Sequence, residues 1–144
     1  MTIFVDTNIL LDVFTQRQPH FASAARLWAE VEGGSVQAIV SAISFNNVYY
    51  VMRKAGGAVK AREAMVILNT LFDVASLDTV IIQQAIGSDI SDFEDAIQYF
   101  SALRAGVAHF VTRDANDFPQ QPLNVVSAQE MMVVLASRRG EKPS

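Results

Sequence analysis

The opening twelve residues constrain the fold of this chain more than any other stretch. Thr2–Val5 is a short apolar run of β-branched and aromatic residues, which predicts a buried strand. The run stops at Asp6, and Thr7 or Asn8 can cap a helix that follows at once. A carboxylate therefore lies where a strand ends and a helix begins, which is the edge where open α/β sheets bind ligands. Taken alone, Asp6 is equally well explained as a residue that helps to cap the helix.

The rest of the chain alternates strands with helices. Further strands are predicted at 36–40, 72–75, 107–112 and 123–126, and helices at 21–31, 44–55, 58–71, 78–86, 91–105 and 127–137. Ser44 and Asp78 can cap two of these helices, and Ser91 and Ser127 each begin a Ser-x-x-Glu capping box. This order predicts a three-layer α/β/α sandwich around a mostly parallel five-stranded sheet. If the chain winds outward over three strands and then returns, strands one and four become neighbours.

Acidic residues recur at the turns of this predicted sheet. Three of them, Asp92, Glu94 and Asp95, fall in the first turn of one helix, where the helix dipole alone would favour each. Asp114 and Asp117 follow the fourth strand, so either would face Asp6 across the crevice between strands one and four. Clustered carboxylates repel one another unless a cation is bound, and Mg²⁺ and Mn²⁺ prefer oxygen ligands. Such an ion can generate hydroxide for attack on phosphorus.

Composition and the absence of several motifs narrow the classes of protein to which this chain could belong. Of 144 residues, 51% are hydrophobic and 18% are charged, which predicts one folded domain over 1–137 with a polar tail at 138–144. The chain has no cysteine, no glycine-rich phosphate loop, no dinucleotide fingerprint and no nucleophile elbow. His20 and His109 are not spaced as a metal pair, and His109 is predicted to be structural. No apolar run is long enough for a membrane span and no signal peptide is apparent, so we expect a cytoplasmic protein.

The net charge of −4 argues against general adhesion to nucleic acid, but it does not exclude an enzyme whose acids hold a cation. A small basic segment, Arg53, Lys54, Lys60 and Arg62, could meet phosphates. A solvated helix end explains this segment equally well.

Four segments resemble the motifs of the PIN-domain nucleases, and together they cover nearly the whole chain. They are Asp6-Thr-Asn-Ile-Leu-Leu-Asp12, Ser41-Ala-Ile-Ser-Phe-Asn-Asn-Val-Tyr-Tyr50, Asp92-Phe-Glu-Asp-Ala-Ile-Gln-Tyr-Phe-Ser-Ala102 and Thr112-Arg-Asp-Ala-Asn-Asp-Phe118. The resemblance implies a metal-dependent endoribonuclease with Mg²⁺ or Mn²⁺, often a toxin with a cognate antitoxin protein, and often a homodimer. It assigns catalysis to Asp6, Asp95, Asp114 and Asp117, with Asp6, Asp95 and Asp117 on the metal and the last two as alternatives for the fourth acid. Arg53, Lys54 and Arg113 are the residues expected to contact RNA.

The second of these segments departs from the family pattern. Where the family has an acid, this chain has Asn46-Asn47, and the alignment places Asn47 in the acidic position. An amide oxygen can ligate a cation, but it brings no charge. The departure leaves two interpretations, a nuclease in which Asn47 replaces the second acid and a non-catalytic domain that binds RNA or a protein partner. A receiver-type signalling domain is a third, although Val125-Val126-Ser127 closes the last strand where a receiver would have a lysine.

Overall fold

A single five-stranded sheet forms the centre of the protein, for which the computed structural model describes residues 1–140. Its strands are β1 (Thr2–Val5), β2 (Gln37–Ser41), β3 (Asp73–Ala75), β4 (His109–Val111) and β5 (Asn124–Val126). All neighbouring strands pair in parallel, in the order β3-β2-β1-β4-β5. Strands β1 and β4 are therefore neighbours, as predicted, and the winding reverses between them.

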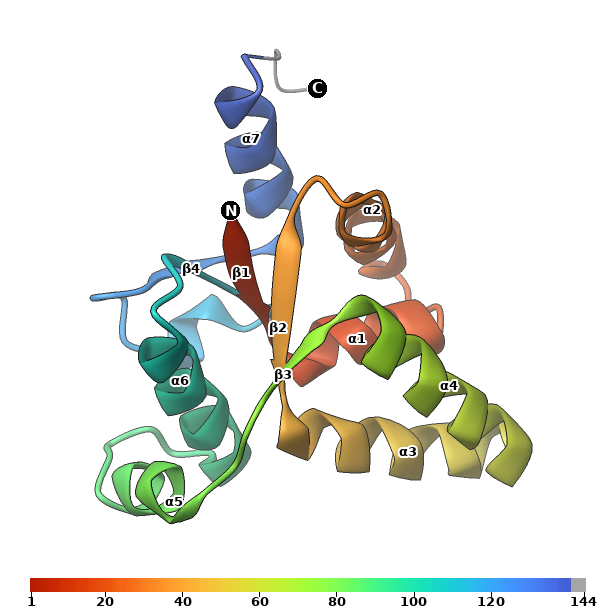
Figure 1. The fold of residues 1–144 in the computed structure, drawn as a ribbon, viewed down its shortest axis with the longest axis horizontal. Helices are drawn as coiled ribbons and strands as arrows, with labels where there is room; N and C mark the ends of the chain where they lie inside the picture. Colours follow the sequence, from red (N-terminus) through yellow and green to blue (C-terminus); the bar gives the residue numbers. More distant parts are fainter. Residues whose placement is uncertain (141–144) are drawn as a thin grey trace.

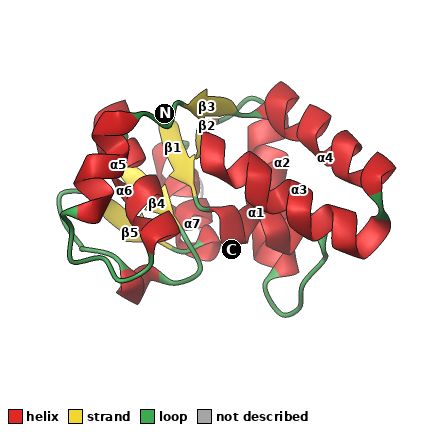
Figure 2. Ribbon diagram, turned by 90° about the horizontal axis from the view of Figure 1, so that it is seen from below, coloured by secondary structure: helices red, strands yellow, loops and turns green. Residues whose placement is uncertain are grey.

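Helices cover both faces of this sheet (Figures 1 and 2), which confirms the predicted three-layer sandwich. One face is covered by α1 (Thr7–Phe14), α2 (Phe21–Glu32), α3 (Ala42–Gly56), α4 (Ala58–Leu71) and α7 (Ala128–Arg138), and the other by α5 (Thr79–Ile86) and α6 (Phe93–Ala105). A short 3-10 helix, η1 (Ala115–Asp117), follows β4. Helices α3 and α4 lie side by side and extend beyond the sheet. No helix in the described part of the chain is long and apolar enough to cross a membrane.

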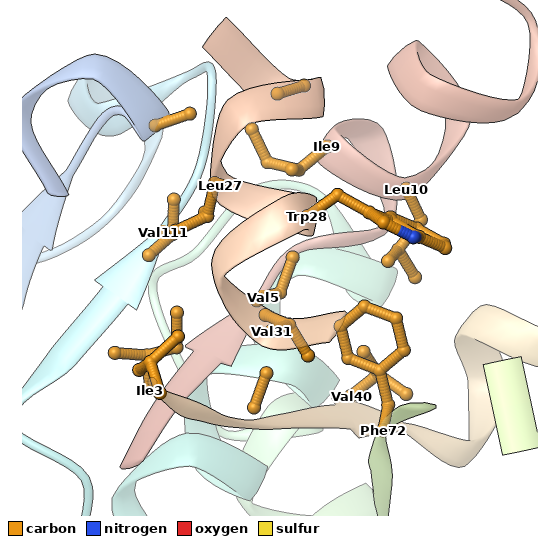
Figure 3. Packing of buried hydrophobic residues seen from close by; sticks show 14 of the residues in the cluster. Ile3, Val5, Ile9, Leu10, Leu27, Trp28, Val31, Val40, Phe72 and Val111 are labelled. Carbon is orange, nitrogen blue, oxygen red and sulfur yellow. The ribbon is translucent and has the colours of Figure 1, made fainter. Parts of the chain in front are cut away.

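The two faces of the sheet have separate cores because successive strand residues point to opposite sides. Ile3 and Val5 of β1 join the larger core with α1, α2, α4 and α7, and Phe4 between them joins the core under α6. Trp28 lies in the larger core, edge-on to Phe72 with ring centroids 5.1 Å apart (Figure 3). On the other face Phe4 stacks on Phe110 at 5.5 Å.

The caps predicted at Thr7 or Asn8, at Ser44 and at Ser91 are wrong, whereas the alternative that Asp6 helps to cap the first helix is confirmed. Asp6 itself caps α1, Ser41 rather than Ser44 caps α3, and Asp92 rather than Ser91 caps α6. Each true cap has an extended backbone, and at Asp6 and Ser41 the strand runs into the helix with no intervening loop. Ser44 is instead buried inside α3, where its hydroxyl hydrogen bonds that of Thr7 at 2.6 Å. The caps predicted at Asp78 and Ser127 are confirmed, the latter with a complete capping box.

The predicted boundaries of the other elements lie within two residues of the structure, and those of the helix at 58–71 coincide with α4. Of the predicted tail at 138–144, Arg138 still belongs to α7 and Arg139 pairs with Glu30 at 3.2 Å. Residues 141–144 lie outside the described part of the chain.

Candidate active site

Asp6 lies at the junction of β1 and β4, at the carboxyl edge of the sheet. Its backbone N–H donates to Val111 O at 2.9 Å, which extends the pairing of the two strands by one residue. Only 3% of Asp6 is exposed. The Thr112 hydroxyl donates to one carboxylate oxygen at 2.7 Å and the Gln98 amide to the other at 2.9 Å. Burial raises the pKa of Asp6 and these two hydrogen bonds oppose the rise, while the charge of Asp114 adds to it.

Gln98 is a site residue that the sequence did not reveal. It is a fully buried polar side chain of α6. Its carbonyl oxygen accepts from the backbone N–H of Thr7 at 3.0 Å, and its amide nitrogen donates to Asp6 and, at 3.4 Å, to Glu94. Through these hydrogen bonds the Gln98 side chain links the first turn of α6 to the start of α1. No local pattern marks this role, because Gln98 and Asp6 are 92 residues apart.

The first turn of α6 brings further acids to the same place. Asp92 caps the helix by accepting the backbone N–H of Asp95 at 2.9 Å. Burial raises the pKa of Asp95 to about 7, and the charges of Asp6, Asp92, Glu94 and Asp117 contribute to that rise. A carboxylate affected by four others is an arrangement that a bound cation would relieve.

The loop after β4 supplies the remaining acids. Asp114 accepts a hydrogen bond from the Asn8 amide at 3.0 Å, and its charge raises the pKa of Asp6. Asp117 ends η1, and its charge raises the pKa of Asp95. The two alternatives for the fourth acid therefore perturb different carboxylates, Asp114 that of Asp6 and Asp117 that of Asp95. Both are exposed, whereas Asp6 is buried.

Asn47 also reaches this group of acids. Its side-chain amide donates to the Glu94 carboxylate. Asn46 is exposed, whereas Asn47 is partly buried. Because α3 begins at Ala42 and its cap is Ser41 rather than the predicted Ser44, Asn47 lies in the second turn of the helix. The helix dipole therefore offers little to a charge at this position.

The basic residues predicted to contact RNA are in two places. Arg53 and Lys54 are exposed in the last turn of α3, about 9 Å or more along the helix axis from Asn47. Lys54 lies over the Tyr50 ring, 5.2 Å from its centroid. Arg113 directly precedes Asp114, and its Nε lies 3.6 Å from the carboxylate of the buried Asp12.

The donor chemistry of this edge fits a hard divalent cation. Asp6, Glu94, Asp95 and Asp117 offer carboxylate oxygens, and they influence one another electrostatically. Within residues 1–140, however, no three acidic or histidine side chains are close enough together to enclose an ion. Among the described ion pairs, none joins a lysine or arginine to Asp6, Glu94, Asp95 or Asp117.

The fold and these acids define a parallel α/β domain with a carboxylate site at its topological switch point. The chain belongs to the PIN-domain family, whose model matches residues 2–116. This membership replaces the receiver-domain interpretation. No curated protein matches the chain in sequence.

Solved structures with the same fold include toxins of toxin–antitoxin systems. The sarcin-ricin-loop-cleaving toxin VapC20 of Mycobacterium tuberculosis is 21% identical with a TM-score of 0.61, over 75% of this chain and 86% of the toxin. A toxin–antitoxin complex from Klebsiella pneumoniae is 23% identical with a TM-score of 0.66, over 88% and 97%. VapBC2 of Rickettsia felis, bound to a promoter DNA fragment, is 13% identical with a TM-score of 0.62, over 88% and 98%. At these identities the likeness establishes the fold.

Proposed function

We propose that the protein is a Mg²⁺- or Mn²⁺-dependent endoribonuclease of the toxin type. The observation that carries the proposal is the position of Asp95, whose pKa rises to about 7 through burial and through four neighbouring carboxylates. Structural acids are normally offset by lysine or arginine, and none of the ion pairs among the described residues serves Asp95. A divalent cation is the partner that such a site would take.

Each residue of the site then has a role. Asp6, Asp95 and Asp117 would hold the ion, with Asp114 as the alternative or additional acid. When bound, the ion would polarise a phosphodiester and activate water. Thr112 and Gln98 keep the Asp6 carboxylate in a fixed orientation through their hydrogen bonds. The Asp6 carboxylate is buried at the base of the edge, whereas Asp114 and Asp117 are exposed on its rim.

The substrate and partners follow from the family. RNA is the proposed substrate, supported by the likeness to VapC20, a toxin that cleaves the sarcin-ricin loop. Arg53, Lys54 and Arg113 are the proposed phosphate contacts. A cognate antitoxin is the proposed protein partner, supported by the toxin–antitoxin complexes that share the fold. A homodimer in the cytoplasm is also proposed. A small neighbouring gene for a DNA-binding protein with an amphipathic tail would support the toxin assignment.

An RNA-cleavage assay with added Mg²⁺ or Mn²⁺ tests this function. We expect cleavage that chelation abolishes, and a loss of at least about 100-fold in Asp95→Asn, because even the outer partners of metal ligands are worth up to about that factor. Asp73→Asn is the matched control, since Asp73 is an exposed acid that begins β3 at the opposite edge of the sheet. If the wild-type protein binds RNA and leaves it intact with every metal, the non-catalytic interpretation replaces this one.

A further inference from the structure

We propose that Asp12 is a positioning residue that holds Arg113 in place for contact with an RNA phosphate. The inference rests on the proposed function, because the phosphate belongs to the substrate named there. It goes beyond that function by giving a role to the second acid of the opening motif. Asp12 would touch neither the RNA nor the cation, and it would act through Arg113 alone.

Asp12 is a buried acid without a hydrogen bond. It lies in α1 with 0% of its surface exposed, and neither of its carboxylate oxygens has a hydrogen-bond partner among the described residues. Burial raises the pKa of Asp12, and the charge of Arg113 is the strongest influence that opposes the rise. Because a buried carboxylate is costly unless a partner offsets its charge, Arg113 is the residue on which Asp12 depends.

The contact between the two side chains uses only the inner nitrogen of the guanidinium. Nε of Arg113 lies 3.6 Å from a carboxylate oxygen of Asp12, and this Nε is itself buried without a hydrogen bond. The Arg113 side chain is nevertheless 23% exposed, and no hydrogen bond within residues 1–140 engages its terminal nitrogens. The N–H groups of these nitrogens can bind a phosphate in a bidentate manner. The pair therefore anchors the base of the guanidinium and leaves its outer end available.

The other two arginine ion pairs of the described residues have the opposite arrangement. Arg104 donates from one terminal nitrogen to Asp78 at 2.7 Å and from the other to a backbone carbonyl at 2.8 Å. Arg139 directs both terminal nitrogens at Glu30, at 3.2 and 3.4 Å. In these two pairs the end that would bind a phosphate is occupied. Arg113 differs from both because its pairing keeps that end free.

The surroundings of the pair also favour a positioning role. Arg113 directly precedes Asp114, so it follows β4 at the edge of the sheet that carries the acids. Asp12 and Arg113 line a cavity of about 270 Å³ between α1, α2 and the start of α7. Because this space lies beside the Arg113 side chain, packing alone does not fix the side chain, and the charge of Asp12 does. A pair that served stability alone would need no free end on Arg113.

The test measures binding of a fluorescein-labelled single-stranded RNA to the full-length protein, by fluorescence anisotropy over a series of salt concentrations. The parent protein and all variants carry Asp95→Asn and are measured in Mg²⁺, so that the RNA stays intact. Arg113→Gln should weaken binding by about 10-fold, as for a lost hydrogen bond to a charged group, and should reduce the salt slope by about 0.7. Asp12→Asn should also weaken binding, by a few-fold, although it removes a negative charge and would by charge alone favour RNA.

Three further variants separate positioning from general effects of charge. Asp73→Asn removes an exposed acid at the opposite edge of the sheet, and it should bind RNA at least as tightly as the parent. Arg104→Gln removes an arginine whose terminal nitrogens are occupied, and it should leave the salt slope unchanged. The double variant Asp12→Asn/Arg113→Gln should bind no more weakly than Arg113→Gln, because Asp12 acts only through Arg113.

The outcomes separate this inference from the proposed function. A parent protein that does not bind RNA overturns both the proposed substrate and the role of Asp12. If the parent binds RNA, the inference alone is overturned when either single variant binds as tightly as the parent, or when the double variant binds more weakly than Arg113→Gln. A wild-type protein that leaves RNA intact while these binding effects are present overturns the nuclease activity and keeps the phosphate contact.

Far-UV circular dichroism shows whether Asp12→Asn is folded. If it is not, Arg113→Lys replaces it in the test. The single nitrogen of lysine can serve either Asp12 or the phosphate, so weaker RNA binding is expected even though the charge is kept. Parental affinity in Arg113→Lys would contradict the proposal.

Discussion

At the scale of single residues, Asp95 shows how an acid that lies near other acids can destabilise the protein that carries it. Its carboxylate lies in a partly buried position near other acids, so the folded protein holds its proton more tightly than the unfolded chain does. Burial raises the pKa values of Asp6 and Glu94 in the same direction. These acids therefore lower the free energy of unfolding of the metal-free protein when they are ionised.

This cost predicts a pH dependence of stability. In the presence of a chelator, the free energy of unfolding should fall as pH rises from about 4 to about 7, because over that range the folded state binds the Asp95 proton and the unfolded state has released it. Urea denaturation at a series of pH values measures this fall. Asp95→Asn should show a shallower fall, with the remainder due to the other acids. A wild-type protein whose stability rises steadily over this range would contradict the assignment.

Acidic residues were the easiest site candidates to choose from the sequence, because the carboxylate itself suggests the role. Asp6 and Asp95 were expected in one site, and the charge of Asp6 contributes to the raised pKa of Asp95. Thr112 and Gln98 were not expected to hold Asp6, because they are 106 and 92 residues away from it in the chain. Their partners depend on how β4 and α6 pack against β1, which no local pattern contains.

At the scale of elements, the start of a helix is set by the last residue whose backbone is still extended. Ser127 illustrates this, since its hydroxyl accepts the Glu130 N–H at 3.0 Å and the Glu130 carboxylate accepts the Ser127 N–H at 3.0 Å. The sequence identified this cap because the Ser-x-x-Glu pattern coincides with the true start of α7. At Ser91 the same pattern was misleading, because the helix begins later and Asp92, whose own backbone is extended, is its cap.

The capping box of α7 leads to a prediction about stability. Ser127→Ala removes one hydrogen bond to an N–H of the first turn, and it should lower the free energy of unfolding by about 1 kcal/mol. Gln129→Ala, an exposed change in the same turn, should have little effect because glutamine and alanine have similar helix propensities. Urea denaturation of both variants measures the difference. Equal stabilities for the two variants would show that the cap contributes little to the folded state.

At the scale of the whole molecule, the alternation of strands and helices was enough to predict the layers and the adjacency of β1 and β4. Right-handed crossovers allow few other arrangements of five parallel strands. What the sequence left open is how the two faces of the sheet depend on each other. The larger core contains Trp28, and a third cluster, made of Ile81, Ala85, Ala96 and Ile97, packs between α5 and α6, the helices of the opposite face.

The single sheet predicts that both faces unfold together. Ile81 is fully buried in α5, so Ile81→Ala should cost about 2–5 kcal/mol of unfolding free energy. Trp28 is the only tryptophan of the chain and lies on the other face, so its fluorescence reports a region that Ile81 does not contact. In one cooperative transition the Trp28 signal and far-UV circular dichroism should shift to lower urea by the same amount. Val80→Ala, an exposed change in the same helix, should stay within about 0.5 kcal/mol of the wild type. If Ile81→Ala moved the circular dichroism transition and left that of Trp28 in place, the two faces would be independent folding units.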